Sequence, residues 1–340
     1  MRPELANWAI ERFTLPGHRI LDPFCGSGTV LLEAWSSGRH SVGTDLNPYA
    51  FVLSMGKVHS PIPSGEDLQT KLDNYREEAE SRVDTITNWV DDWAASFFHP
   101  RTLQEALAWV SVLRDAHEYF LLSCLLGILH HQRPGFLSFP ASHTVPYLRT
   151  TKFPPDAFSN LYEYRAVYPR LQKKVLRVAT KLANSGIKFS PEVQRQVIQC
   201  DASESHSDTF DAIITSPPYM GQLHYGRDNR LRLQFLGETD WEKLDRKASP
   251  RLNHFLQEFP SWISQWSKSL RPGGRLVLLV GDKTNTTRRP FAELVSELVT
   301  TSGNGFSGLS IEASSIPDKR RTRKNCEGSS SELLISFERE

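Results

Sequence analysis

Two short strings hold the residue types whose spacing could do chemistry. The first is residues 22–29 (DPFCGSGT) and the second, far downstream, is residues 215–219 (TSPPY). The first has the glycine pattern of a loop that binds a nucleotide-like cofactor. The second offers acceptor oxygens and an aromatic ring, which suit an exocyclic amino group on a flat base. Together they predict transfer of a methyl group to a base nitrogen.

The first string lies between a short apolar strand ending at 20–21 and a segment of helical composition at 30–35. This strand–turn–helix context is the one that a glycine-rich cofactor loop requires. Gly26 and Gly28 let the backbone turn tightly and approach a ligand closely. Asp45 ends the next apolar strand, where such folds place the acid that binds ribose hydroxyls. The spacing therefore predicts a nucleoside cofactor.

The identity of that cofactor depends on three features, because a Gly-x-Gly turn alone is common between strands and helices. Asp22 stands at the tip of the first strand and Asp45 at the tip of the second. The third glycine of the dinucleotide fingerprint is missing. These features favour S-adenosylmethionine over NAD, and a nicotinamide-dependent oxidoreductase is the alternative.

The second string follows another apolar strand, residues 210–215. Its two consecutive prolines fix φ and lack N–H donors, so their carbonyls and the Ser216 hydroxyl remain as acceptors. The ring of Tyr219 is suited to stacking on a base. The alternative is a proline-stiffened loop with a buried tyrosine, but the position after a strand and downstream of a cofactor loop favours a base pocket.

In these two strings the chain resembles the amino-methyltransferases of DNA, which methylate N4 of cytosine or N6 of adenine. Their Asp-Pro-Phe-x-Gly-Ser-Gly-Thr loop matches residues 22–29, and their Ser/Asp/Asn-Pro-Pro-Tyr tetrad matches residues 216–219. The resemblance implies an α/β fold, the doubly wound Rossmann-like sheet of class I S-adenosylmethionine-dependent methyltransferases. It extends to a helix at 3–13 that covers the methionine moiety and to strands at 197–202 and 274–280.

The resemblance also implies the site residues. The residues it implies as catalytic are Ser216, Pro217, Pro218 and Tyr219. Those that it implies for S-adenosylmethionine binding are Asp22, Phe24, Gly26, Ser27, Gly28, Thr29, Asp45, Asp201 and Ala202. Within this set Asp45 binds the ribose, Asp201 the adenine, and Asp22 orients the loop or the amino group of the cofactor.

The first tetrad residue carries substrate information in the family. Serine is usual in cytosine-N4 enzymes, whereas adenine-N6 enzymes mostly have Asp or Asn, so Ser216 favours cytosine N4 and leaves adenine N6 as the alternative. Both amino groups are conjugated and weakly nucleophilic. Hydrogen bonds to Ser216 and to the Pro217 carbonyl would free the nitrogen lone pair for in-line attack. The base must be flipped out, because its amino group is inaccessible inside a duplex.

The four cysteines argue against other chemistries. Methylation of cytosine C5 requires a thiolate nucleophile, and none of Cys25, Cys124, Cys200 and Cys326 follows a proline as that motif requires. Neither the cysteines nor the histidines have zinc-site spacing, so we expect no metal. Few cysteines, no apolar N-terminal signal and no run of about 18 apolar residues predict a cytoplasmic protein with no membrane partner.

Charge is informative only locally, because the formal net charge is +1. Basic residues gather at 163–181 and at 318–324. In a chain with a base pocket such clusters indicate phosphate contacts. The residues predicted to contact nucleic acid are Arg227, Arg230 and Arg232, just past the tetrad, and Lys319, Arg320 and Arg321 near the C-terminus.

The stretch from 51 to 195 is far longer than a usual connection between neighbouring strands. We therefore predict a catalytic domain of residues 1–50 and 196–340 with a mostly helical insertion at 51–195, a candidate target-recognition region. Family insertions commonly follow the third strand, whereas this one precedes it, so a structural cap or dimerisation module is the competing interpretation. The Gly/Ser-rich stretches 301–310 and 327–330 are predicted to be mobile loops before a last strand at 332–337.

The sequence thus predicts a site-specific DNA methyltransferase, with a cognate restriction endonuclease as a candidate partner. An RNA methyltransferase acting on guanine N2 or adenine N6 uses a related loop and tetrad and is the main alternative. A silent nucleic-acid-binding module would have lost motif residues, and none is lost.

Overall fold

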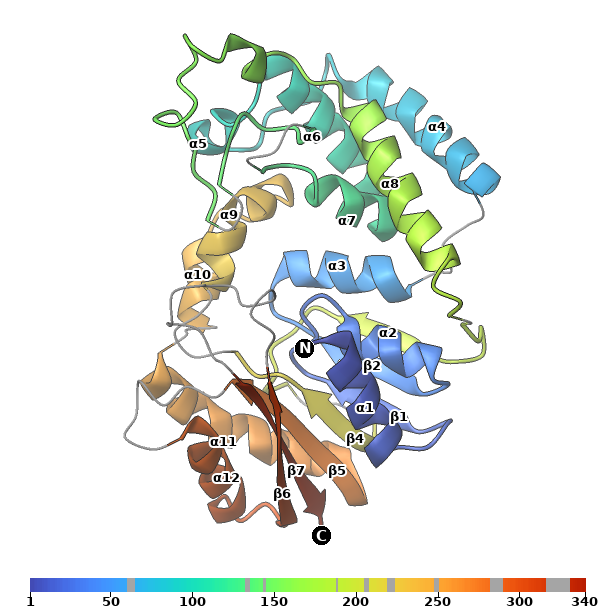
Figure 1. Cartoon of the computed structure of the whole chain (residues 1–340), viewed down its shortest axis with the longest axis vertical. Coiled ribbons are helices and arrows are strands. Elements are labelled where there is room, and N and C mark those ends of the chain that lie inside the picture. The colour runs from blue at the N-terminus through green and yellow to red at the C-terminus, as the bar shows by residue number, and fades with distance from the viewer. Residues whose placement is uncertain are drawn as a thin grey trace. The chain divides into compact units, whose positions relative to one another are not determined.

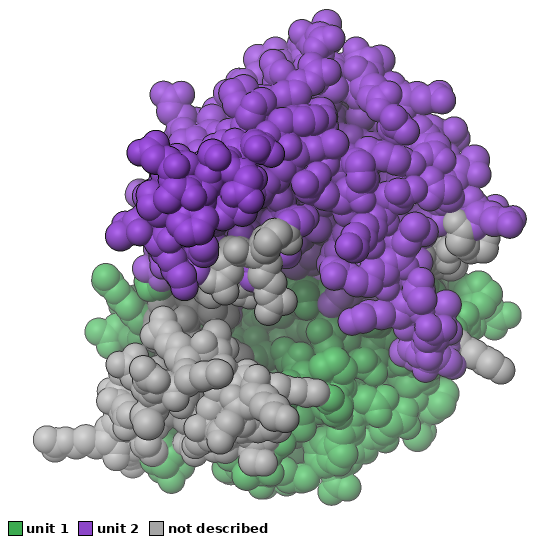
Figure 2. Space-filling view, turned by 45° about the horizontal axis from the view of Figure 1, so that its top comes forward, with its two compact units in different colours: residues 1–46, 189–224, 247–340 green, residues 47–188, 225–246 purple. Residues whose placement is uncertain are grey.

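The computed structural model describes most of the chain and divides it into two compact units (Figure 2). Unit 1 comprises residues Met1–Leu46, Phe189–His224 and Lys247–Glu340, and unit 2 comprises Asn47–Lys188 and Tyr225–Arg246. The described residues are 1–59, 65–131, 135–142, 145–187, 189–204, 208–218, 224–247, 251–281, 290–315 and 331–340. Unit 2 therefore includes, besides most of the predicted insertion, a segment that follows the tetrad.

Unit 1 is built on a seven-stranded sheet in the order β3-β2-β1-β4-β5-β7-β6 (Figure 1). Its strands are β1 (Arg19–Asp22), β2 (His40–Thr44), β3 (Arg195–Ile198), β4 (Phe210–Thr215), β5 (Leu270–Gly281), β6 (Phe306–Ser315) and β7 (Ser331–Arg339). Strands β1 to β5 pair in parallel, and β7 is antiparallel to both β5 and β6. The order reverses direction at β1, which confirms the predicted doubly wound Rossmann-like α/β fold.

Both faces of this sheet are buried by helices, as parallel sheets require. The helices of unit 1 are α1 (Pro3–Phe13), α2 (Thr29–Ser36), α11 (Leu252–Ser269) and α12 (Phe291–Thr301). Ile20 of β1 packs in the cluster that contains α1 and α2 residues, whereas the next residue, Leu21, packs in the cluster that contains α11 and α12 residues. The alternation of side chains along a strand explains why adjacent apolar residues serve opposite faces.

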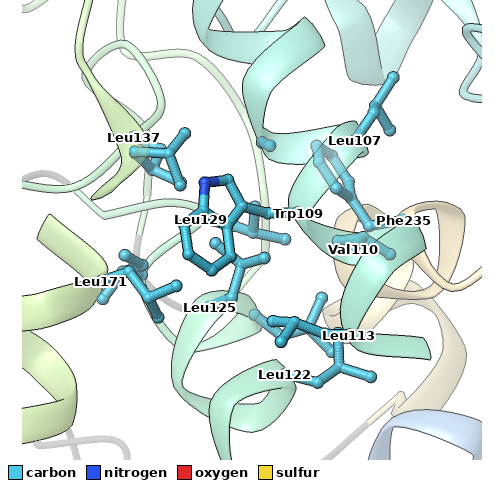
Figure 3. Close-up of a cluster of buried hydrophobic side chains, with 14 of the residues drawn as sticks. Leu107, Trp109, Val110, Leu113, Leu122, Leu125, Leu129, Leu137, Leu171 and Phe235 are labelled. Carbon is cyan, nitrogen blue, oxygen red and sulfur yellow. The ribbon is translucent and has the colours of Figure 1, made fainter. Parts of the chain in front are cut away.

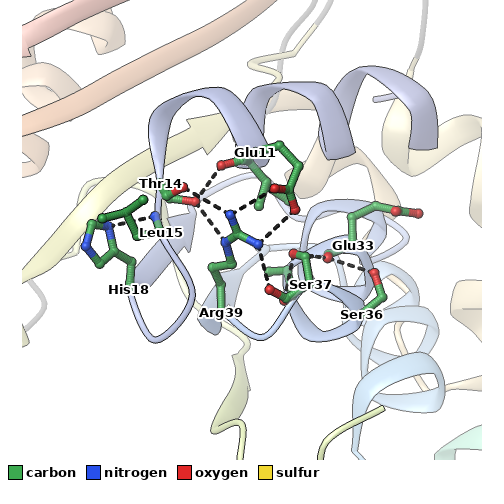
Figure 4. A network of polar contacts seen from close by, with 10 residues as sticks. Glu11, Thr14, Leu15, His18, Glu33, Ser36, Ser37 and Arg39 are labelled. Atoms are coloured by element: carbon green, nitrogen blue, oxygen red, sulfur yellow. Dashed lines mark hydrogen bonds and ion pairs between the residues drawn. The ribbon is translucent and has the colours of Figure 1, made fainter. Parts of the chain in front are cut away.

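A buried guanidinium joins α1 to the start of β2 (Figure 4). Arg39 is 3% exposed and pairs with Glu11 of α1 at 2.8 Å. It also donates to the carbonyl oxygens of Thr14 at 3.0 Å and of Ser37 at 2.6 Å. One side chain therefore satisfies backbone groups at the ends of both α1 and α2, on either side of the cofactor-loop sequence.

The prediction of a mobile loop over 301–310 is wrong for residues 306–310, which form the first half of β6. β6 pairs with β7 from Phe306↔Arg339 to Ser315↔Ser331. The register shifts between Ser307 and Ser310, where Gly308 has φ +64°. The glycine that resembles a loop signal thus accommodates an irregularity within a strand.

The regular secondary structure of unit 2 is helical among the described residues, apart from one isolated bridge between Ala141 and Leu148. Its helices are α3 (Pro48–Val58), α4 (Gly65–Arg82), α5 (Asp92–Ala95), α6 (Pro100–Asp115), α7 (Tyr119–Leu126), the 3₁₀ turn η1 (Ser159–Leu161), α8 (Val167–Ala183), α9 (Tyr225–Phe235) and α10 (Trp241–Lys247). Asn47 caps α3 by accepting from the Tyr49 N–H, and Pro48 occupies its first turn.

The core of unit 2 surrounds Trp109 of α6 (Figure 3). Leu125 of α7, Leu171 of α8 and Phe235 of α9 belong to the same buried cluster. The side chain of Gln234 adds polar contacts, since its Nε2 donates to Asp91 Oδ2 at 2.6 Å and its Oε1 accepts from the Asp91 N–H at 2.9 Å. These contacts explain why residues 225–246 belong to unit 2.

Candidate functional site

The candidate site lies at the carboxyl ends of β1 and β4 in unit 1. These strands pair in parallel, with Ile20 opposite Ala212 and Leu21 opposite Ile213. Strand order reverses at this pair, and doubly wound sheets bind their ligands in the crevice at such a switch point. Asp22 ends β1 and Thr215 ends β4, so the two sequence motifs leave the sheet side by side.

A direct hydrogen bond joins the two motifs. The Thr215 hydroxyl donates to Asp22 Oδ1 at 2.6 Å, and the Phe24 N–H donates to the same oxygen at 3.2 Å. Asp22 is 3% exposed, and this burial raises its pKa from 3.8 to about 7, even though the Thr215 hydrogen bond acts in the opposite direction. Asp22 therefore serves as a buried tie between the motif loops and changes protonation near neutral pH.

The glycine-rich loop is fixed by backbone geometry and by β2. Gly28 adopts the left-handed conformation (φ +72°) at the N-cap of α2, and its N–H donates to the Cys25 carbonyl at 2.7 Å. Gly26 also has a positive φ, and its N–H donates to Asp45 Oδ2 at 2.9 Å. The Cys25 N–H donates to the Thr44 carbonyl at 2.9 Å. The structure therefore brings Asp45 against the predicted cofactor loop.

A third glycine, which we did not single out from the sequence, permits this packing. A Cβ on Gly43 of β2 would lie 2.5 Å from Leu31 Cδ1 and 2.9 Å from Cys25 Cβ. The loop and α2 can approach β2 only because this position has no side chain. Its sequence signal is a glycine inside an apolar strand, which often marks close approach of another backbone.

Aromatic residues of α11 connect two of the predicted cofactor-binding positions. The Phe24 ring packs edge-on against Trp262, with 4.8 Å between ring centroids, and the Trp266 indole N–H donates to the Ala202 carbonyl at 3.0 Å. Trp266 also contacts Phe24, at 6.0 Å between centroids. Residue spacing alone gave no sign that α11 would meet the loop.

Asp201 and Ala202 lie in the turn beyond β3, since this strand ends at Ile198 and not at 202 as predicted. Asp201 Oδ1 accepts from both the Ser203 N–H at 3.0 Å and the Ser203 hydroxyl at 2.8 Å. Asp22 is the last residue of β1, Asp45 follows β2 and Asp201 comes after β3, so each acid lies at the carboxyl end of a parallel strand. The three acids thus mark the same edge of the sheet.

The tetrad leaves this edge directly after Thr215. Pro217 and Pro218 are buried and Ser216 is half-buried, whereas Tyr219 lies outside the described residues. On the cofactor side, Ser27 is exposed and Thr29 is the first residue of α2.

The arginines predicted to contact nucleic acid have partners within unit 2. Arg230 pairs with Asp91 at 3.1 Å and lies 3.9 Å above the Trp93 ring. Arg232 donates to the Leu126 carbonyl at 3.3 Å, and Arg227 pairs with its neighbour Asp228 at 3.2 Å. The predicted Lys319, Arg320 and Arg321 lie outside the described residues.

Thiols and metal ligands give no other site in the part of the chain that the structure describes. Cys124 and Cys200 are free thiols, and burial raises the pKa of each to about 11. No described group of three or more His, Cys, Asp or Glu side chains could hold a metal ion. None of the described helices is long and apolar enough to cross a membrane.

The chain is similar to known DNA methyltransferases. Residues 3–55 match the DNA methylase family model. Over 273 residues the chain is 26% identical to the type II methyltransferase M.BsoBI of Geobacillus stearothermophilus, a match that covers 74% of this chain and 53% of that protein. It is 24% identical to the type II methyltransferase M.MvaI of Kocuria varians, over 72% of this chain and 58% of that protein. These matches confirm the predicted resemblance to the DNA amino-methyltransferases.

The chain spans little more than half the length of those two relatives. Among solved structures it is similar to a SAM-dependent methyltransferase of Methanosarcina mazei, with 12% identity, a TM-score of 0.39 and coverage of 97% of this chain and 96% of that one.

Proposed function

We propose that this chain, a relative of the DNA amino-methyltransferases, transfers a methyl group from S-adenosylmethionine to the exocyclic amino group of a flipped base in DNA, preferentially N4 of cytosine. The observation that carries the proposal is the hydrogen bond between Thr215 and Asp22. It links the two strands whose ends hold the cofactor-type loop and the tetrad. A methyl donor and a base amino group must meet at one point, and this edge of the sheet carries residues suited to both.

The residues present fit S-adenosylmethionine, which supplies an electrophilic methyl group when bound. The left-handed turns at Gly26 and Gly28 leave the loop backbone open to a ligand without a Cβ in the way. Asp45 is held against this loop by the Gly26 N–H and would accept hydrogen bonds from the ribose. Asp201 and Ala202, at the end of the neighbouring strand, would hold the adenine, and Phe24 would contribute an apolar wall.

The tetrad supplies acceptors for the base. The Ser216 hydroxyl and the Pro217 carbonyl would each accept an N–H from the amino group, which weakens conjugation with the ring and makes the nitrogen a better nucleophile. The prolines add rigidity and offer no N–H that could compete. The neutral hydroxyl of Ser216, at the first position of the tetrad, favours cytosine N4 as the target. The Tyr219 ring would stack on the base.

The test is transfer of a labelled methyl group from S-adenosylmethionine to unmethylated duplex DNA, followed by digestion and mass spectrometry of the nucleosides. We expect label in N4-methylcytosine. Label in N6-methyladenine would contradict the base assignment alone. Label in total RNA with none in DNA would contradict the substrate, and no transfer to either would contradict the activity.

The matched variants are Ser216→Ala and Ser296→Ala, since Ser296 is a buried serine of α12 whose hydroxyl donates to the Ala292 carbonyl. Loss of one hydrogen bond that aligns the reacting nitrogen is expected to lower kcat by about 10- to 100-fold in Ser216→Ala. The rate of Ser296→Ala should stay within about 2-fold of the parent rate. Equal rates in the two variants would remove Ser216 from the mechanism.

Two further points belong to this proposal. We infer a cytoplasmic location from the proposed substrate and from the free thiols of Cys124 and Cys200. A cognate restriction endonuclease is the expected partner. DNA carrying the methyl mark should resist cleavage by that enzyme, and cleavage of fully methylated DNA would contradict the pairing.

A further inference from the structure

Helix α8 of unit 2 carries a stripe of positive charge. Its 17 residues include five basic side chains and no acidic one. The five are Arg170, Lys173, Lys174, Arg177 and Lys181, which we call the α8 stripe. At about 100° per residue they all fall within a sector of roughly 100° around the helix axis. The charges therefore share one face of the helix.

The other faces of α8 are occupied by packing. Val167, Leu171 and Val175 are fully buried in the core of unit 2. On the neighbouring face, Tyr168 donates to Asp73 of α4, and Gln172 Nε2 donates to Gln69 Oε1 at 3.0 Å. The exposed members of the α8 stripe, Lys173, Arg177 and Lys181, thus occupy the face that packs against neither the core nor α4.

Three of the five stripe residues are open to an outside partner, whereas Arg170 and Lys174 are half-buried and Arg170 Nε is buried. Lys173, Arg177 and Lys181 are exposed. Lys173, Lys174, Arg177 and Lys181 form no ion pair with any carboxylate of the described residues, for which the limit is 4.0 Å between nitrogen and oxygen. Arg170 donates to the Ala166 carbonyl at 3.0 Å.

Three other surface cations of unit 2 have acidic partners. Arg76 pairs with Glu80 at 2.7 Å, Arg82 with Asp115 at 2.6 Å, and Arg101 with Asp84 at 2.7 Å. The stripe differs from them in having none in the described part of the chain. Like charges four residues apart on a helix also destabilise it by about 0.2–0.5 kcal/mol per pair. An external polyanion would relieve this repulsion.

We propose that the α8 stripe docks the phosphate backbone of duplex DNA. This rests on the proposed function, in which DNA is the substrate. Lys173, Arg177 and Lys181 are spaced about 6 Å apart along the helix axis and span about 12 Å, while duplex DNA presents one phosphate charge per about 1.7 Å of its axis. The stripe can therefore meet several phosphates at once, and it supplies affinity that is independent of base sequence.

The sequence analysis predicts phosphate contacts both for the basic cluster at 163–181, which includes α8, and for Arg227, Arg230 and Arg232. The structure gives Arg230 and Arg232 internal contacts, to Asp91 and to the Leu126 carbonyl. Breaking these contacts would reduce the gain from binding a phosphate. Binding of a phosphate by Lys173, Arg177 or Lys181 breaks no such ion pair or hydrogen bond among the described residues.

The experiment measures binding of a fluorescein-labelled duplex by anisotropy, without S-adenosylmethionine, between about 50 and 200 mM salt. The variant is Lys173→Gln/Arg177→Gln/Lys181→Gln. Each phosphate contact that is lost should make the slope of log K against log salt shallower by about 0.9, so we expect a change of roughly 2–3. At about 100 mM salt the affinity should fall by at least about 10-fold.

The matched control removes the same charge from the same unit at cations that already have partners, Arg76→Gln/Arg82→Gln/Arg101→Gln. We expect its slope to change by less than about 1. The charge-preserving Lys173→Arg/Lys181→Arg should keep the parent slope. Equal slope changes in the two triple variants would overturn the proposal, because net charge would then explain the effect. A shallower slope in Lys173→Arg/Lys181→Arg would also overturn it.

The failure of this inference is distinguishable from failure of the proposed function. Binding of DNA that depends on the α8 stripe, without methyl transfer, would support the role of the stripe and contradict the proposed activity. Methyl transfer with a salt slope that the stripe variant does not change would support the activity and contradict the role of the α8 stripe. Stripe-dependent binding of single-stranded RNA, or of anionic phospholipid vesicles, in place of duplex DNA would contradict the partner proposed here.

Discussion

Replacing Thr215 with valine should reveal how the buried tie between the motif loops works. The substitution keeps the shape of the side chain and removes the hydroxyl that donates to Asp22 Oδ1 at 2.6 Å. A hydrogen bond to a charged group contributes about 1.5–3 kcal/mol, whereas one to a neutral group contributes about 0.5–1.5 kcal/mol. The cost of Thr215→Val should therefore depend on the protonation of Asp22.

The sign of the pH dependence follows from the Asp22 pKa. Burial raises this pKa from 3.8 to about 7, so the folded protein holds the proton more tightly than the unfolded chain between these pH values. The Asp22 contribution to stability is fully present below about pH 4 and is lost as pH rises through 7, by about 4 kcal/mol at about 1.4 kcal/mol per pH unit. At pH 8 Asp22 is charged and depends most on Thr215, and at pH 5 it is protonated and depends less.

Hydrogen–deuterium exchange of the β1 and β4 amides measures this locally in unit 1. Relative to the parent, exchange in Thr215→Val should be about 13- to 160-fold faster at pH 8 and about 2- to 13-fold faster at pH 5. Thr215→Ser keeps the hydroxyl and is the control, with a cost that should not change between the two pH values. The same acceleration of Thr215→Val at both pH values would refute the proposed coupling to Asp22.

Four further substitutions test the packing around the site and in unit 2. Gly43→Ala should cost about 1–3 kcal/mol of unfolding free energy in urea titrations, because the new Cβ would lie 2.5 Å from Leu31 Cδ1. A cost below about 0.5 kcal/mol would contradict the close packing of β2 against α2. Arg39→Met should cost about 1–3 kcal/mol of unfolding free energy in the same titrations, because buried carbonyls lose their donor. Glu11→Gln should cost under about 1 kcal/mol, because the Glu11 side chain is 52% exposed. Equal costs in the two variants would show that the ion pair, and not the hydrogen bonds to the carbonyls, dominates. Trp109→Ala should cost about 3–5 kcal/mol, seen as faster hydrogen exchange in α6 and α7, and unchanged exchange there would contradict its central place in the core of unit 2.

Elements with local signals were predictable from the sequence. Helix α1 runs from Pro3 to Phe13 and β4 from Phe210 to Thr215, as predicted. Proline in the first turn marks the start of α1, and the prolines after Ser216 stop β4. The Asp22 loop was recognisable because its glycines need positive φ, a property of single residues.

Features that depend on distant residues were not predictable in the same way. The Asp22–Thr215 hydrogen bond joins positions 193 apart, and neither residue type signals the other. β6 has a loop-like composition and becomes a strand through its pairing with β7. Trp262 and Trp266 read as ordinary core residues of α11 until the fold brings them to Phe24 and Ala202.

The place of β7 in the sheet sets the order in which the chain can mature on the ribosome. β7 lies between β5 and β6 and is the only strand to which β6 is paired among the described residues, yet it is synthesised after both. The last segment of unit 2 ends at Arg246, so this unit can be complete while the sheet of unit 1 still has an open edge. At about 5–20 residues per second, synthesis from 247 to 339 takes roughly 5–20 s. In the later part of that interval, after Gly281 and before β7 is made, the apolar edge of β5 is unpaired and exposed to aggregation.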